Sequence, residues 1–385
     1  MNFGFSQEQE MLRENAARFL DAECPAAFVR TVMAGDTGHC RELWTKMAEL
    51  GWLGILVPEE YGGTGGSFLD LAVVLEEMGK TLLPGPFFAT VLLGSTAVLA
   101  GGSAAQKRRI LPSLVHGDLM LTLALAEESG RFDAQGVALA AARADKGFAL
   151  NGEKLFVPDA HVADRIIVAA RTTQSRDAEH GITLFEIDAK APGVGVTQLR
   201  TVDMTRRLCR VALDNVRVSR RDVLGRINGG WAVLCRVLDH ATAGLSMEMV
   251  GTAQRALDMS VRYARERIQF GKPIGSFQAV KHKCVDMMVQ VENARSLCYY
   301  AAWAVTEGAP EARQAVAMAK AYCSDMCKTV CSEAIQAHGG IGFTWEHDLH
   351  LFYRRALAAE AHLGNAPVHR EAVARQLVRR TRLAH

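Results

Sequence analysis

The stretch from residue 263 to 287 constrains the fold most, because it predicts two long helices joined by a rigid corner. The first helix is expected to run to about Phe270, where Gly271 can take a positive φ and Pro273 cannot continue the helix. Ser276 is expected to cap the second helix, in which apolar residues recur at steps of three and four. Taken alone, this is the pattern of an ordinary helix hairpin, so the function of the corner must be inferred from the rest of the chain.

Three segments with different patterns follow one another along the chain. Residues 1–117 and 229–385 space their apolar residues as helices do, whereas residues 118–228 hold short alternating or β-branched runs. A chain of 385 residues is also longer than one hydrophobic core usually supports. We therefore predict an α+β protein with an N-terminal helical domain (1–117), a middle β domain (118–228) and a C-terminal helical domain (229–385). The runs that predict strands are Leu119–Leu125, Val137–Ala142, Phe148–Leu150, Arg165–Ala170, Ile182–Ile187 and Cys209–Leu213.

Composition argues against several classes of partner and location. The 44 basic and 42 acidic residues leave a formal charge of +2, so no global field attracts nucleic acid or an anionic membrane. Apolar runs such as Leu69–Leu75 are far shorter than the roughly 20 residues that span a bilayer, and residues 1–6 do not read as a signal peptide. Nine scattered cysteines, an odd number, favour free thiols in a reducing compartment. We expect a cytoplasmic protein with no nucleic-acid partner and no membrane partner.

Two further patterns could suggest a ligand-binding site, but both are better explained by a structural role. A dinucleotide-binding G-x-G-x-x-G starting at Gly63 would need glycine at position 68, where Phe68 stands, so the cluster Gly62–Gly66 predicts a turn before a helix. Neither set of possible metal ligands has an established zinc spacing, so we predict small core residues, surface histidines and no metal. These sets are Cys323, Cys327 and Cys331 on one predicted helical face, and His347 with His350.

The corner at 263–287 is one of several motifs that occur in a recognisable order. The others are the glycine-rich segment Leu50–Gly66, the turn Asn151–Lys154 and the loop Gln336–Gly342. With these motifs the chain resembles the acyl-CoA dehydrogenase family over nearly its whole length. The resemblance implies a C-terminal four-helix bundle that builds the oligomer, FAD as cofactor, an acyl-CoA substrate oxidised to a trans-2,3-enoyl-CoA, and electron-transferring flavoprotein as electron acceptor.

The flavin-facing motifs of that family are altered here. The family's Thr-Glu-x-x-x-Gly-Ser-Asp reads Ala126-Glu-Glu-Ser-Gly-Arg-Phe-Asp133, so a hydroxyl has gone. The family's Trp-Ile-Thr, with a ring against the isoalloxazine and a hydroxyl near flavin N5, reads Phe156-Val-Pro158. Phe156 keeps an aromatic ring and is the weaker candidate for a cofactor contact. Pro158 cannot make the hydrogen bond.

The catalytic base is missing from both positions that the family uses. A family member removes an α-proton with a carboxylate while a hydride leaves the β-carbon for flavin N5. The usual glutamate corresponds to Leu363 and the alternative one to Ala241. Glu248 lies on the same helical face as Ala241, but seven residues of helix rise about 10.5 Å, more than its side chain spans. Glu248 is therefore either a base for a different substrate pose or a structural or interface glutamate.

The residues that the family donates to a neighbour's FAD are present, although for Arg267 an interface salt bridge is the alternative. We predict a subunit that completes the FAD site of a related catalytic chain in an α2β2 assembly. In this it resembles the base-lacking subunits of heterotetrameric actinobacterial acyl-CoA dehydrogenases that degrade sterol side chains. The alternatives are a self-sufficient homotetramer with Glu248 as an unusual base, and a non-catalytic scaffold that lost FAD. The donated residues are Arg267, Phe270, Gln278, Gln336, Gly339 and Gly340.

Overall fold

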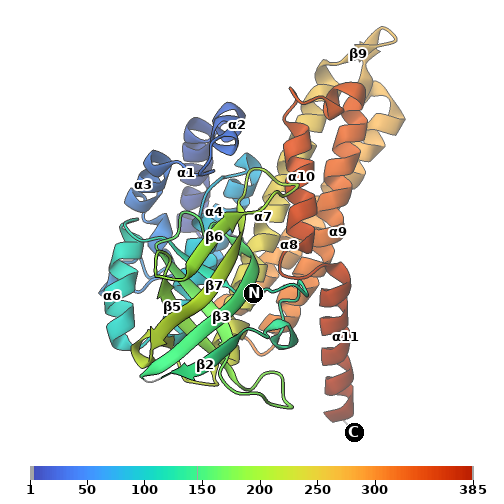
Figure 1. Ribbon diagram of the computed structural model, residues 1–385. Coiled ribbons are helices and arrows are strands. Elements are labelled where there is room, and N and C mark those ends of the chain that lie inside the picture. The colour runs from blue at the N-terminus through green and yellow to red at the C-terminus, as the bar shows by residue number, and fades with distance from the viewer. Residues whose placement is uncertain (1–3, 145, 384–385) are drawn as a thin grey trace.

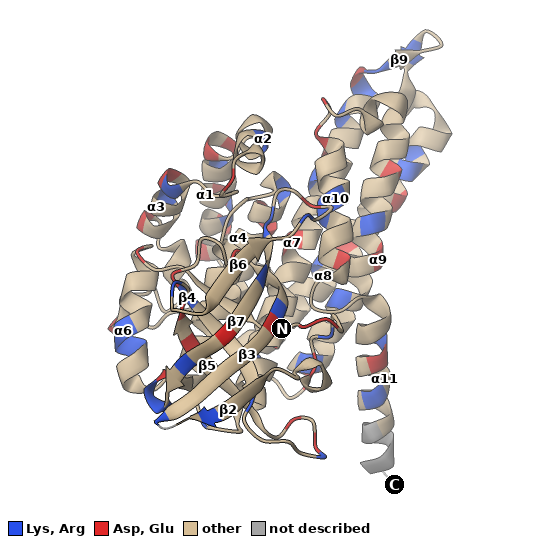
Figure 2. Cartoon of the chain, viewed as in Figure 1, with Lys and Arg blue, Asp and Glu red and all other residues tan. Residues whose placement is uncertain are grey.

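The computed structural model describes residues 4–144 and 146–383, which fold into helices, a sheet and helices in that order (Figure 1). The predicted α+β class and the order of its three parts are confirmed. The boundaries after residues 117 and 228 stay a prediction. Among the described residues no helix is both long and apolar enough to span a membrane. Charged residues of both signs are interspersed along the helices and strands (Figure 2).

Serine capping boxes start three of the N-terminal helices. The hydroxyls of Ser6, Ser67 and Ser103 accept hydrogen bonds from backbone N–H groups three residues on, and the side chain at that third position bonds back to the serine N–H. The turn predicted at Gly62–Gly66 does precede a helix. These helices are α1 (Gln7–Glu23), α2 (Ala26–Ala34), α3 (Arg41–Glu49), α4 (Phe68–Thr81), the π-helix η3 (Phe88–Ser95), α5 (Thr96–Gly101) and α6 (Ala104–Val115).

Helix α4 packs directly against the first long helix of the bundle, α7 (Gly230–Glu266). A Cβ on Gly251 would lie 1.9 Å from the carbonyl oxygen of Glu76, and a Cβ on Gly79 would lie 2.2 Å from that of Glu248. Only glycine fits at this crossing, so the two backbones touch. The contact fixes the N-terminal helices on the bundle.

The middle of the chain forms one eight-stranded, mainly antiparallel sheet in the order β6-β7-β3-β2-β4-β5-β8, with β1 parallel to β4. All six predicted strand segments contain strand residues. The sequence missed β6, whose residues are all half-buried or exposed and so show little apolar pattern, and β8, which is two residues long. The strands are β1 (Leu121–Ala124), β2 (Ala140–Ala144), β3 (Gly147–Pro158), β4 (Arg165–Arg171), β5 (Ile182–Asp188), β6 (Val194–Gln198), β7 (Leu208–Ser219) and β8 (Val223–Leu224).

In the described part of the chain four more α-helices follow α7, and the bundle ends in a projecting tip far from the sheet (Figure 1). Stacking of Tyr263 on His338, with ring centroids 4.5 Å apart, shows that α7 and α9 end side by side. The tip carries a small hairpin of β9 (Ile268–Gln269) and β10 (Lys272–Pro273). The helices are α8 (Gln278–Thr306), α9 (Ala312–His338), α10 (Leu349–Ala361) and α11 (Ala366–Leu383).

The corner differs from its prediction in two details. Helix α7 ends at Glu266, not near Phe270, because Phe270 and Gly271 form the two-residue turn of the hairpin, with φ of 53° and 76°. Ser276 does not cap α8: its hydroxyl donates to the carbonyl of Pro273 at 2.7 Å, and Phe277 takes the N-cap position. The rigid corner between two helices is nevertheless present.

Candidate functional site

The junction of sheet and bundle holds a cavity of only about 10 Å³. That is room for no more than one water molecule. Side chains from the sheet, the π-helix, α7 and the loop after α10 fill the space between these elements. None of the described residues that line the cavity carries a carboxylate. They are Leu93, Leu123, Leu125, Ala126, Phe132, Leu155, Phe156, Pro158, Leu238, His362 and Leu363.

Three rings and one guanidinium pack together here, and two of the rings, Phe132 and His362, line the cavity. The rings of Phe88 and Phe132 meet His362 edge to face, with centroids 5.6 and 5.5 Å away. Behind them the guanidinium of Arg206 lies over Phe88 at 5.0 Å. Burial, with the nearby charges of Arg206 and Lys320, lowers the pKa of His362 to about 3. The imidazole is therefore neutral at neutral pH and packs like an apolar ring.

The altered motif at residues 126–133 holds Phe132 in place. The carboxylate of Glu127 accepts a hydrogen bond from the fully buried Lys154 at 2.6 Å and from two backbone N–H groups across the loop. At the other end, Asp133 accepts from backbone N–H groups and pairs with Arg131. Burial lowers the pKa of Lys154 to about 8, despite the opposing effect of Glu127. A loop anchored at both ends thus carries a phenylalanine into the cavity where the family has a serine.

Phe156 and Pro158 both line the cavity. Phe156 has φ of 56°, lies where the pairing of β3 with β7 is irregular, and is 38% exposed. The carbonyl of Pro158 accepts from the hydroxyl of Thr122 at 2.6 Å, and its nitrogen has no proton to donate. This segment therefore offers a ring but no hydrogen-bond donor at Pro158.

The two residues that correspond to the family's base, Ala241 and Leu363, cannot accept a proton. Ala241 is fully buried on α7. Leu363 is buried in the loop after α10, with φ of 59°. That loop is fixed from behind, because the carbonyl of Leu363 contacts the ring of His369 at 3.0 Å. A leucine held rigidly in this place closes the cavity.

Glu248 is committed to an ion pair away from the cavity. Both of its oxygens accept from one guanidinium nitrogen of Arg206 at 2.6 Å, and Glu248 is only 4% exposed. Burial lowers the pKa of Arg206, but the Glu248 carboxylate, with Asp203 and Asp159, raises it overall, so the guanidinium stays charged. A series of contacts thus leads from Glu248 through Arg206 and Phe88 to His362, which lines the cavity. A catalytic role for Glu248 stays a prediction.

The tip of the bundle presents the other set of candidate residues to solvent. Phe270 is 88% exposed, and a Cβ on Gly339 or Gly340 would meet nothing within 4 Å. The described residues offer no hydrogen-bond or ion-pair partner to the side chains of Arg267, Gln278 and Gln336, which include a guanidinium and two amides. An exposed, unpaired cation beside open glycine backbone suits a phosphate-bearing group.

Sequence reasoning missed four residues that shape the cavity. Three of them, Phe88, Arg206 and His362, act through contacts between distant segments that no local spacing reveals. The fourth, Lys320, had a signal: it is a lysine among the small apolar residues of α9. Its ammonium donates to three backbone carbonyls around the end of α10 and to a serine hydroxyl, all within 3.0 Å. It therefore fixes the loop that carries Leu363.

Comparison with known proteins agrees with this arrangement. Models of the N-terminal, middle and C-terminal domains of acyl-CoA dehydrogenase match residues 6–118, 122–216 and 228–378. The probable acyl-CoA dehydrogenase YngJ of Bacillus subtilis is 33% identical, over 98% of this chain and 100% of its own. The caffeyl-CoA reductase-Etf complex subunit CarC of Acetobacterium woodii is 30% identical, again over 98% and 100%.

Two further similarities bear on the site. The acyl-CoA dehydrogenase IpdE2 of Mycolicibacterium smegmatis is 32% identical, over 93% of this chain and 95% of its own. The structure of butyryl-CoA dehydrogenase from Megasphaera elsdenii superposes with a TM-score of 0.91 and 30% identity, covering 98% of this chain and 100% of that one. Both matches extend over nearly the whole of each chain.

Proposed function

This chain belongs to the acyl-CoA dehydrogenase family, and we propose that within it the chain completes the FAD site of a related, catalytically complete subunit. Members of the family are FAD flavoproteins that oxidise CH–CH bonds of acyl-CoA substrates. The proposed assembly is an α2β2 heterotetramer that forms a trans-2,3-enoyl-CoA. The observation that carries the proposal is the cavity of about 10 Å³, filled by this chain's own side chains.

The residues present fit FAD at one end of the molecule and not at the other. At the sheet–bundle junction, Phe132 and His362 occupy the space and Pro158 offers no donor, so an isoalloxazine does not fit. At the tip, Arg267 is free to neutralise a pyrophosphate, and the amides of Gln278 and Gln336 can donate hydrogen bonds. We therefore propose that this chain contacts FAD through the residues at the tip of its bundle.

When bound, FAD supplies the acceptor for the hydride that leaves the substrate. In the proposed assembly this chain binds and orients the dinucleotide end through its tip, and the partner subunit supplies the carboxylate base. This division follows from the absence of a carboxylate among the described residues that line the cavity of this chain.

The test is expression of this chain alone and together with a related family member that keeps the Thr-Glu…Gly-Ser-Asp motif and a glutamate base. We expect bound flavin and acyl-CoA oxidation only in the complex, and no activity once the partner's glutamate is changed to glutamine. One FAD per chain and full activity for this chain alone would contradict the proposal. A colourless protein in every complex would instead favour the non-catalytic scaffold.

In the alternative hypothesis, a self-sufficient homotetramer, Glu248 is the catalytic base. In that case Glu248→Gln abolishes exchange of the substrate α-proton while flavin stays bound. Because Glu248 already accepts from Arg206 through both oxygens, we expect no such loss. Exchange that persists in the variant eliminates this alternative.

Three finer assignments rest on the resemblance and on the relatives. We propose electron-transferring flavoprotein as the electron acceptor, since the relative CarC is named as part of an Etf complex. We propose a steroid-derived acyl-CoA as substrate, because residues 362–365, His-Leu-Gly-Asn, resemble the corresponding motif of the base-lacking subunits that degrade sterol side chains. The test is whether the complex oxidises a steroid side-chain CoA ester with a higher kcat/KM than octanoyl-CoA.

We propose a cytoplasmic location because all nine cysteines are free thiols.

A further inference from the structure

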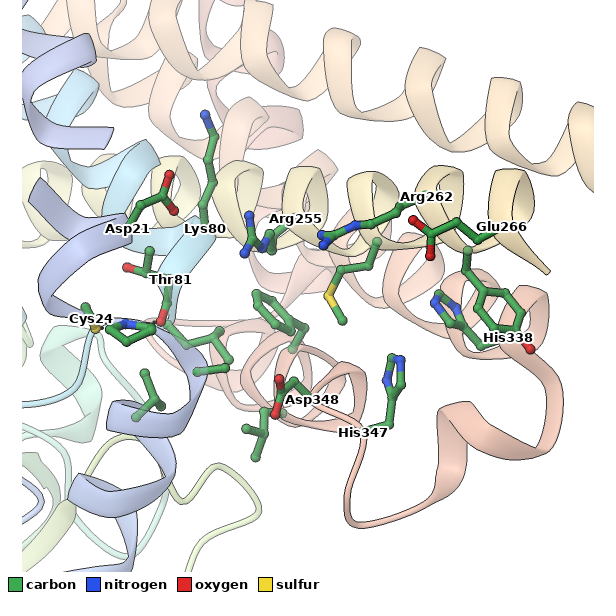
Figure 3. A pocket seen from close by; sticks show the side chains of 18 residues that line it. Asp21, Cys24, Lys80, Thr81, Arg255, Arg262, Glu266, His338, His347 and Asp348 are labelled. Atoms are coloured by element: carbon green, nitrogen blue, oxygen red, sulfur yellow. Dashed lines mark hydrogen bonds between the residues drawn. The ribbon is translucent and has the colours of Figure 1, made fainter. Parts of the chain in front are cut away.

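A second and larger cleft, of about 340 Å³, lies between the N-terminal helices and the bundle (Figure 3). Its walls come from α1 and α2, the end of α4, the second half of α7 and the segment that leads into α10. It shares no lining residue with the filled cavity. Its volume falls at the lower end of the range typical of small-molecule sites.

Two guanidinium groups in this cleft have no partner among the described residues. Lys80 pairs with a glutamate of its own helix at 2.7 Å, and Asp348 pairs with an arginine of α2 at 2.6 Å. Arg255 and Arg262 form no hydrogen bond or ion pair through their side chains in the described part of the chain. In Figure 3 the guanidinium of Arg262 points back along α7 toward that of Arg255. Two guanidinium groups on the same stretch of α7 thus line the cleft, and neither has an acceptor in the described residues.

The remaining charged groups do not cancel this pair. Asp21 and Glu266 lie toward opposite ends of the cleft, and neither forms an ion pair within 4.0 Å in the described residues (Figure 3). Burial lowers the pKa values of His338 and His347 below their usual range, so both rings are mainly neutral at neutral pH. The centre of the cleft is therefore left with the positive charge of the arginines.

The lining also includes apolar side chains. Leu351 and Phe352 are buried and form the floor with the half-buried Met259. At the end nearer the tip, the ring of Tyr263 stacks on His338. A ligand in this cleft would meet a cationic wall on α7 and an apolar floor on α10.

We propose that this cleft binds a small amphipathic oxyanion, with its phosphate or carboxylate group between Arg255 and Arg262 and its apolar body against Met259 and Phe352. The guanidinium fork matches either oxyanion in bidentate geometry, and such charge-assisted hydrogen bonds are about twice as strong as neutral ones. An anion between the two arginines also relieves their mutual repulsion. The proposal is independent of the FAD role, because the cleft uses neither the filled cavity nor the six tip residues.

The test is isothermal titration calorimetry of the full-length chain, in the oligomer that it forms, with three separate probes. AMP represents an amphipathic phosphate, octanoate an amphipathic carboxylate and inorganic phosphate an oxyanion with no apolar body. We expect AMP or octanoate to bind, and inorganic phosphate to bind more weakly than the better of the two. Arg255→Gln and Arg262→Gln should each weaken that binding by about tenfold or more, since each loses a charge-assisted contact.

Arg265→Gln is the matched control, because Arg265 lies on the same helix but lines a different groove. It should leave binding unchanged. Arg255→Lys keeps the charge without the fork and should give an intermediate affinity, which separates recognition from a folding defect. The proposal is overturned if neither AMP nor octanoate binds at millimolar concentration, if inorganic phosphate binds as well as both, or if the control weakens binding as much as the cleft variants do.

Discussion

At the scale of single residues, the ion pair of Glu248 and Arg206 holds the carboxylate that the sequence offered as an unusual base. Both partners are largely buried, and the arginine also covers Phe88. Removing one partner of a buried pair leaves the other charge without compensation, which costs more than the pair contributes. The two residues should therefore behave as a unit in stability measurements.

We expect Glu248→Gln to lower the free energy of unfolding by about 3 kcal/mol, and Arg206→Met to do likewise. The double variant should recover much of the loss, since neither charge is then left unpaired. Denaturant unfolding of the four proteins measures this coupling. Additive effects in the double variant would show that the pair does not act as a unit.

The second prediction at this scale concerns the pKa of His362. The folded protein keeps this imidazole neutral down to a pKa of about 3, whereas the unfolded chain binds a proton near the ordinary value of 6.5. Between these values the unfolded state binds more protons, so stability falls as the pH falls. This contribution is absent in His362→Leu.

From pH 7 to pH 5, the wild type should lose about 2 kcal/mol more of unfolding free energy than His362→Leu. Chemical denaturation of both proteins at the two pH values gives the difference directly, because other titrating groups are common to both. An equal loss in the two proteins would mean that His362 is not held neutral.

At the scale of elements, Lys320 on α9 holds the end of α10. Its ammonium reaches the carbonyls of Ala359, Glu360 and Gly364, which the helix end would otherwise leave without donors. Burial lowers its pKa to about 8, so it remains mainly charged at neutral pH. The buried ammonium of Lys320 thus caps the C-terminus of α10 and fixes the loop that closes the cavity.

Lys320→Met should destabilise the protein by about 2 kcal/mol or more, because buried carbonyls lose their donor. Hydrogen exchange should quicken in the loop at residues 362–365. Lys328→Met is the control on the same helix: it loses only a half-exposed pair with Glu360 and should cost less than about 1 kcal/mol. Loop exchange that is unchanged by Lys320→Met would refute the capping role.

At the scale of the whole molecule, the filled cavity and the open tip lie in different parts of the fold, so one can be changed without the other. Arg267→Gln should lower the FAD affinity of the complex with a catalytic partner by about tenfold or more, through loss of a charge-assisted contact. Arg265→Gln, two residues away, should not. Flavin content after dialysis measures both. Equal retention in the two variants would place FAD elsewhere.

How much could be predicted from the sequence depended on how local each signal was. The turn before α4 and all six strand segments follow from neighbouring residues, and they are confirmed. The end of α7 was misplaced because a two-residue hairpin turn at Phe270 looks, in sequence, like a helix end followed by glycine. Strand β6 was missed because it buries too little to show an apolar pattern.

For the site, sequence alone determined which chemical groups are missing: Leu363 and Ala241 cannot accept a proton and Pro158 cannot donate one, wherever they lie. It also determined that Arg267 and its neighbours are present at the corner between two helices. Only the tertiary structure decided that the cavity is closed, because Phe88, Phe132 and His362 come from three distant segments. Local spacing reports what one element presents, whereas packing between elements settles whether a space remains.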